Sequence, residues 1–238
     1  MRAPRVPSIR VLGQVLPATL LGVMGLTFGL SILGALVPGL LAAGALVPAL
    51  VFEGQVWRLF TWVFFETSPI GLVFAILMLW WFGRELAYAW GPWKFVLVYL
   101  GLAGATASVV CALAATLLPR LAVLGWAAAF PMTQALILAW AVLFPFRQIL
   151  VYFLFPLGGR NLIYLNVGLT ALWGVFYGFA LVLPHFVAMG LMAAYERDPV
   201  LDYYWLRLKL ALSGTGRRRA RHLKAVEKPP EEPPRWVH

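Results

Sequence analysis

Charged residues are scarce in this sequence of 238 residues: only 12% are Asp, Glu, Lys or Arg, while 62% are hydrophobic. A soluble domain averages about 25% charged and about 45–50% apolar residues. So few charges could not cover a surface in contact with water, and the mean hydropathy of +0.85 agrees. The composition therefore excludes a soluble globular protein.

Cysteine and metal-ligand patterns are also missing. The single cysteine, Cys111, excludes an internal disulfide and a cysteine-based zinc site. No cluster of His, Cys, Asp and Glu has metal-ligand spacing, and there is no Gly-rich phosphate loop, so we expect neither metal nor cofactor. The apolar runs lack the strict alternation of a membrane β-barrel.

The sequence does contain long apolar runs. Between Val11 and Tyr195 there are only six basic and three acidic residues, and about 20 apolar residues cross a bilayer as one helix. The pattern predicts an all-α polytopic membrane protein with six transmembrane helices. The predicted spans are Val11–Val37, Pro69–Ala87, Trp93–Leu118, Leu121–Phe144, Leu162–Ala180 and Leu181–Tyr195, the last two nearly fused.

The net charge of +10 indicates orientation rather than nucleic-acid binding. With both termini in the cytoplasm, 17 of the 19 basic residues fall on the inner side, as the positive-inside rule requires. The basic segment Met1–Arg10 resembles the start of a signal peptide, but the following apolar run is too long, so we expect a retained first span. We predict an integral, multi-pass protein of a bacterial inner membrane.

Two connecting segments are too apolar to lie in water. We expect residues 38–67 to lie in the outer interface, with Trp57 and Trp62 at headgroup depth, and residues 147–157 to lie at the inner interface. Residues 1–196 would then form the membrane domain. Residues 197–212 would form an interfacial amphipathic helix, and residues 213–238 a disordered tail. The tail's Arg217, Arg218, Arg219 and Arg221 would contact anionic lipid.

Ionisable residues inside spans are the first candidates for function in such a protein. His185 is the only histidine within the predicted spans, and Glu66 and Glu85 lie at the two ends of the second. No Ser–His–acid set stands out. A packed or hydrogen-bonded histidine is the simpler interpretation of His185.

A family resemblance enters at Gly54–Trp62, whose sequence is GQVWRLFTW. It resembles the Gly-x-x-Trp-Arg-x-x-Thr signature of the outer loop in the rhomboid superfamily, with Trp57 and Arg58 at its centre. Gly83 and Gly91 match the family's Gly-x₇-Gly turn, and the resemblance covers about Pro48–Arg197. It implies a six-span bundle related to membrane serine proteases that use a Ser–His dyad.

The family's catalytic positions are degenerate here. Ala127 stands where the resemblance places the serine nucleophile, and Gly71 and Ala75 stand where it places the His and Asn that stabilise the oxyanion. One such donor contributes about 10²–10³ in rate. The dyad histidine corresponds to His185 and is retained. We therefore expect no catalytic residues and interpret the chain as a pseudoprotease, derlin-like around Trp57-Arg58.

Three functions follow from these residues. The first is a non-proteolytic protein that binds transmembrane segments of clients in quality control or scaffolding. The second is an active intramembrane serine protease whose site is misassigned. The third is a transporter or channel subunit, although the paired intramembrane charges of ion-coupled transport are lacking. Oligomerisation stays open, and Arg58 is expected to pair with carbonyls or with Glu66.

Overall fold

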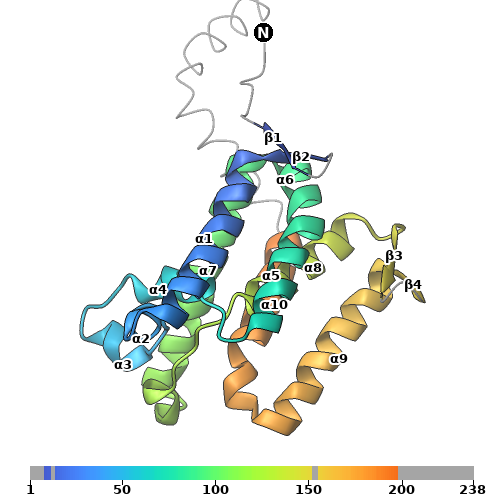
Figure 1. Cartoon of the computed structure of the whole chain (residues 1–238). Helices are drawn as coiled ribbons and strands as arrows, with labels where there is room; N and C mark the ends of the chain where they lie inside the picture. The colour runs from blue at the N-terminus through green and yellow to red at the C-terminus, as the bar shows by residue number, and fades with distance from the viewer. Residues whose placement is uncertain (1–7, 12–13, 152–154, 198–238) are drawn as a thin grey trace, which may run out of the picture. The chain divides into compact units, whose positions relative to one another are not determined.

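The computed structural model describes residues 8–11, 14–151 and 155–197, and residues up to Glu196 form one compact unit (Figure 1). The described residues end at Arg197. The rest of the predicted amphipathic helix and the tail, with Arg217, Arg218, Arg219 and Arg221, lie outside them. The described chain is mostly helical, with two short hairpins of two strands each.

Four helical stretches are long and apolar enough to cross a membrane. They are α1 (Ala18–Leu36), the continuous stretch α5 (Pro69–Met78), η2 (Leu79–Gly83) and α6 (Arg84–Trp90), α7 (Pro92–Thr116), and α10 (Phe179–Arg197). Two further apolar helices are α8 (Phe130–Leu143) and α9 (Gly159–Tyr177); α8 and the apolar part of α9, Asn161–Tyr177, fall short of that length. Each of the six predicted apolar segments thus contains an apolar helix, and four of these helices reach spanning length.

The first predicted span begins too early. Strands β1 (Ser8–Val11) and β2 (Gln14–Pro17) pair antiparallel, and helix α1 starts only at Ala18. Pro17 is the N-cap, with an extended ψ of 135°. Proline disfavours helical geometry in the residue before it, so the helix begins after Pro17 and leaves the preceding strand in place.

The fourth predicted span, Leu121–Phe144, is wrong over its first nine residues. A short 3₁₀ helix, η3 (Pro119–Val123), leads into an extended segment, and α8 begins only at Phe130. In the extended segment Trp126 exchanges two backbone hydrogen bonds with Leu46, of 2.8 and 2.9 Å. Proline is favoured in the first turn of a helix, and Pro131 marks that start. At about 21 Å, α8 is shorter than the hydrocarbon core of about 30 Å.

The boundary between the last two spans lies at Gly178 rather than at Ala180. Gly178 has φ +94°, which a residue with a side chain rarely adopts, and it separates α9 from α10. The predicted inner interfacial segment contains β3 (Gln148–Val151) and β4 (Phe155–Gly158), which pair antiparallel.

The outer segment 38–67 is largely helical, with α2 (Leu40–Gly44), α3 (Pro48–Phe52), α4 (Arg58–Thr61) and η1 (Trp62–Phe64). Trp57 is half exposed, consistent with the predicted headgroup position. The same prediction is wrong for Trp62, which is fully buried in the core. Its Nε1 donates to the carbonyl of Leu59 at 3.2 Å, so the indole N–H binds a group of the protein instead of a lipid headgroup.

Arg58 binds the C-terminal end of α2. Its Nη1 donates to the carbonyl oxygens of Ala42 and Ala45, both at 2.6 Å, and its Nε donates to Gln55 Oε1 at 2.8 Å. The residue is only 5% exposed. The last carbonyls of a helix have no partner within the helix, so the guanidinium satisfies groups that the helix leaves unpaired. The prediction that Arg58 pairs with carbonyls is confirmed, whereas Glu66 is not its partner.

Trp57 and Thr61 of the motif bind the two carbonyls that lie between the two bound by Arg58. Trp57 Nε1 donates to Ala43 at 3.2 Å, and Thr61 Oγ1 donates to Gly44 at 2.8 Å. Four successive carbonyls are thus bound by three side chains at the spacing Trp-Arg-x-x-Thr. The signature thus joins α4 to the C-terminal end of α2 within the outer segment.

The two glycines of the Gly-x₇-Gly turn serve different purposes. A Cβ at Gly83 would lie 3.0 Å from Leu20 and 3.3 Å from Phe95, so this glycine permits close packing. Gly91 has φ +93° and makes the turn between α6 and α7.

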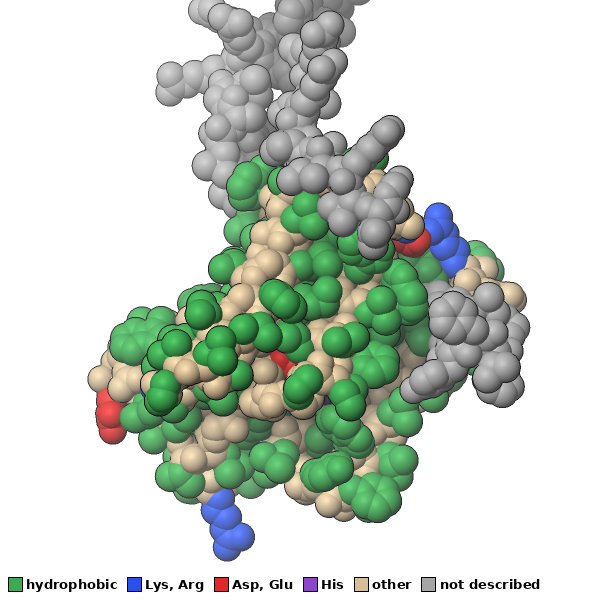
Figure 2. Space-filling model, in the orientation of Figure 1, with side chains coloured by type: hydrophobic (Ala, Val, Ile, Leu, Met, Phe, Trp, Pro, Cys, Tyr) green, Lys and Arg blue, Asp and Glu red, His purple; other side chains and the backbone are tan. Residues whose placement is uncertain are grey.

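The core consists of apolar side chains between α1, α5–α6, α7, α8 and α10. Apolar side chains also cover most of the face seen in Figure 2, and the charged side chains visible there lie mainly near its margins. This distribution fits a surface in contact with lipid.

Replacing Arg58 with methionine should destabilise the fold strongly. Hydrogen bonds to charged groups contribute about 1.5–3 kcal/mol each, and Arg58→Met removes both of these bonds and leaves the two carbonyls without their donor. We expect a loss of more than about 3 kcal/mol in the free energy of unfolding, measured as a lower melting temperature in detergent. Trp57→Phe, which removes one donor, should cost about 1 kcal/mol.

The control is Arg120→Met, which removes an arginine from the exposed start of η3. Equal melting temperatures for Arg58→Met and Arg120→Met would show that the carbonyl contacts do not stabilise the fold.

Candidate functional site

The four positions singled out by the family resemblance lie on three elements. Gly71 and Ala75 lie one turn apart on α5, Ala127 lies in the extended segment before α8, and His185 lies on α10. Ala75 is fully buried, and His185 is 7% exposed. Gly71 and Ala127 are partly buried, so two of the four positions lie in the interior and two at its margin.

Contacts on both sides of Ala127 bring its segment to α10. Trp126 Nε1 donates to the carbonyl of Leu181 at 3.1 Å, one turn before His185. The rings of Phe130 and His185 meet edge to face, with centroids 6.1 Å apart. The retained histidine thus packs against the start of α8, close to where the resemblance places a nucleophile.

Glu66 is the acidic residue at this place. Its Oε2 accepts from the backbone N–H of Ala129, and its Oε1 accepts from that of Thr67, both at 3.2 Å. Its own backbone N–H donates to Ser31 Oγ of α1 at 2.9 Å. Glu66 therefore joins α1, the entry to α5 and the first turn of α8.

The carboxyl group of Glu66 occupies space beside Gly71. A Cβ at Gly71 would lie 2.8 Å from Glu66 Oε1 and 2.7 Å from Ser68 Oγ, closer than such atoms approach. Ser68 caps α5 by accepting from the Gly71 N–H at 2.9 Å. A histidine at position 71, as the family pattern has it, could not be accommodated without displacing Glu66 and Ser68.

Burial raises the pKa of Glu66 above its usual value of 4.5, and hydrogen bonds from the backbone of Thr67, Ala129 and Phe130 offset part of that rise. The N-terminus of a helix favours a negative group, so the first turn of α8 is a suitable partner for this carboxyl. The donors there are already engaged by a residue of the same chain.

The chemistry available to His185 is limited. Its Nδ1 is buried without a hydrogen bond of good geometry among the described residues. Ala127, Gly71 and Ala75 provide neither a hydroxyl nor a side-chain donor. Among the described residues, no group of three or more His, Cys, Asp or Glu could hold a metal ion.

A buried polar network between α8 and α9 was not predicted. Gln134 Nε2 donates to Thr170 Oγ1 at 2.8 Å, Asn166 Nδ2 donates to the Gln134 carbonyl at 2.9 Å, and Thr170 Oγ1 also donates to the Asn166 carbonyl at 2.8 Å. All three residues are buried. Asn166 and Thr170 are not ionisable, but their spacing of four in an apolar helix is the sequence signal for this network.

Glu66 should show its role in the pH dependence of stability. Because folding raises its pKa, the folded protein binds the proton more tightly than the unfolded chain. Its contribution is therefore most favourable near and below pH 4.5 and falls as the pH rises through the raised pKa. Glu66→Gln keeps an oxygen acceptor for the Ala129 N–H and should remove this fall, as measured by melting temperature against pH.

Glu66→Ala is the contrasting variant. It leaves the buried N–H of Ala129 without an acceptor, which costs about 1–3 kcal/mol, and should melt below Glu66→Gln at every pH. If both variants melt alike and keep the wild-type pH dependence, Glu66 does not hold the start of α8.

Comparison with known families agrees with the resemblance of the Gly54–Trp62 sequence. Residues 53–194 match the family model for the Rhomboid domain, which is more than half of the 238 residues. The match begins at the Trp57-Arg58 motif and extends past His185. No curated protein matches the chain. With its long apolar helices, the chain is an integral, multi-pass membrane protein, and it belongs to the rhomboid superfamily.

Proposed function

We propose that this rhomboid protein does not cleave peptide bonds and instead binds transmembrane segments of client proteins laterally. The observation that carries the proposal is the position of Glu66. Its carboxyl engages the backbone N–H of Ala129, two residues after Ala127, and fills the space beside Gly71. The outer-loop motif and the helices of the family are retained, and the contact between Glu66 and Ala129 lies where the family has its reaction centre.

Two physical arguments oppose hydrolysis at this place. Ala127 has no hydroxyl, so the resemblance leaves His185 with nothing to activate. Oxyanion stabilisation requires free donors aimed at the developing charge, but the Ala129 N–H is already bound to Glu66 and the side chains of Gly71 and Ala75 offer none.

Helix α9 is the element that a client could displace or extend. Its main packing partner is α8, and it lies at the edge of the bundle in Figure 1. The contact contains the polar network of Gln134, Asn166 and Thr170, and interhelical hydrogen bonds in membranes contribute only about 0.6 kcal/mol on average. The rest of α9 exposes large apolar side chains, among them Tyr164, Leu169, Val175, Phe176 and Tyr177.

Short helices give the proposal a physical advantage for polar clients. The length of α8, about 21 Å, is well below the hydrocarbon thickness of about 30 Å. A short hydrophobic element is accommodated by local thinning of the bilayer. Thinner hydrocarbon lowers the cost of a polar side chain within a transmembrane segment. We therefore favour client proteins whose transmembrane segment contains polar residues.

A defined reporter helix in proteoliposomes tests this function. We expect a photocrosslinking amino acid at Phe74 of α5 or Leu169 of α9, both exposed, to capture a reporter with a central aspartate. The matched reporter carries leucine at that position. A central charge costs about 2.5–3.5 kcal/mol, so partial relief of about 1.4 kcal/mol should give about tenfold more crosslinking.

The control position is Leu97 on α7, which is also exposed. Equal capture of both reporters, or equal capture from Leu97, would show that collision in the bilayer explains the crosslinks and would contradict lateral recognition.

A further inference from the structure

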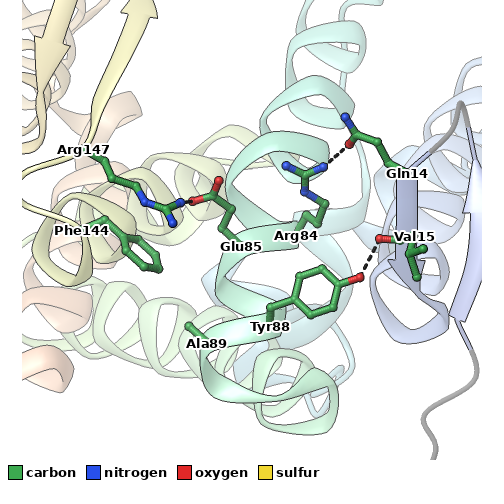
Figure 3. A pocket seen from close by; sticks show the side chains of 8 residues that line it. All are labelled: Gln14, Val15, Arg84, Glu85, Tyr88, Ala89, Phe144 and Arg147. Atoms are coloured by element: carbon green, nitrogen blue, oxygen red, sulfur yellow. Dashed lines mark hydrogen bonds and ion pairs between the residues drawn. The ribbon is translucent and has the colours of Figure 1, made fainter.

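A cavity of about 640 Å³ opens at the end of the bundle where α6 meets the β1–β2 hairpin (Figure 3). Arg84 and Tyr88 of α6 point toward β2 on one side. Glu85 points toward Arg147, which follows α8, on the other. The lining thus holds two arginines, one glutamate and the polar side chains of Gln14 and Tyr88, together with the apolar residues Val15, Ala89 and Phe144.

One cation in this cavity is not neutralised by a described residue. Glu85 Oε2 accepts from Arg147 Nη1 and from Trp140 Nε1, both at 2.7 Å. Arg84 donates to the neutral amide oxygen of Gln14, and within the described ranges it forms no ion pair with a carboxylate. A guanidinium has five N–H donors and binds phosphate in bidentate fashion, so Arg84 has donors to spare for a phosphate group.

Tyr88 and Gln14 fix the position of this guanidinium. The Tyr88 hydroxyl donates to the carbonyl of Val15 at 2.7 Å, which holds β2 against α6. Gln14 then presents its amide oxygen to Arg84. The donor is therefore pre-positioned at the cavity rather than extended into solvent.

A second, apolar cavity of about 510 Å³ shares Gln14 with the first. Phe28 of α1 lines one side, and Val73, Leu77 and Trp81 of the α5–η2 stretch line the other. Residues spaced three or four apart share a helix face, so the row from Val73 through Leu77 and Trp81 leads to Arg84 and Tyr88. The apolar groove continues into the cationic cavity.

The dimensions of the two cavities match one lipid of a single leaflet. Val73 and Arg84 are separated by about 16 Å along the helix, close to half of the hydrocarbon core, which is about 15 Å. An acyl chain in the groove would place the phosphate at the height of Arg84.

We propose that this pair of cavities binds one anionic glycerophospholipid, with its phosphate on Arg84 and an acyl chain between Phe28 and the Val73–Trp81 face. The site lies at the far end of α5–α6 from Gly71 and does not depend on client binding. The bound lipid joins the β1–β2 hairpin to α6 and stabilises that end of the bundle.

Native mass spectrometry of the full chain in detergent, titrated with phosphatidylglycerol, tests the site. We expect one retained lipid per wild-type chain and about tenfold weaker binding by Arg84→Gln, since a charge-assisted hydrogen bond is lost. Arg120→Gln, the same change on η3, should bind as the wild type does. Phosphatidylglycerol should also raise the melting temperature of the wild type and of Arg120→Gln, but not that of Arg84→Gln.

Two partial ligands distinguish the sources of the chemistry. Glycerol phosphate carries the phosphate without chains, and diacylglycerol carries the chains without phosphate; each should bind at least tenfold more weakly than the whole lipid. Glycerol phosphate binding as tightly as the lipid would indicate a free-phosphate site, and diacylglycerol doing so would indicate an apolar groove alone. Either result, or unchanged lipid binding by Arg84→Gln, would overturn the proposal.

Discussion

The contact of Glu66 with the first turn of α8 is the interaction on which the candidate site depends. Through its carboxyl and its backbone N–H, this residue joins α8 and α1 at the entry to α5. The start of α8 is where the family resemblance expects catalysis, so the same contact that supports the fold occupies that place. The contact of Glu66 with the start of α8 therefore both supports the fold and contributes to the proposed loss of hydrolysis.

Arg58 binds unpaired carbonyl groups at the C-terminal end of a helix, whereas Glu66 binds an N–H at the N-terminal end of another. Helix ends leave N–H or C=O groups without partners within the helix. Glu66 accepts from the N–H of Ala129 at the start of α8, and Arg58 donates to the carbonyls of Ala42 and Ala45 at the end of α2. With so few charged residues in the chain, these two are used to close helix ends inside the protein.

The sequence predicts the apolar helices and their order well because their length and composition are set by the bilayer. Hydropathy misplaces the helix boundaries near Pro131 and Gly178 by two to nine residues, because backbone geometry decides where a helix begins and ends. Trp-Arg-x-x-Thr could be recognised from the residues, but its four carbonyl partners could not. The contact of Glu66 with Ala129 bridges 63 positions and has no local signal.

The central claim is that the rhomboid frame persists here without hydrolysis. The most direct measurement is cleavage of a panel of transmembrane rhomboid substrates by the purified chain in proteoliposomes, with His185→Ala and Ser68→Ala beside it. The account predicts no product above background from any of the three proteins. Cleavage by the wild type that either substitution abolishes would contradict it, and would make His185 or Ser68 part of a working active site.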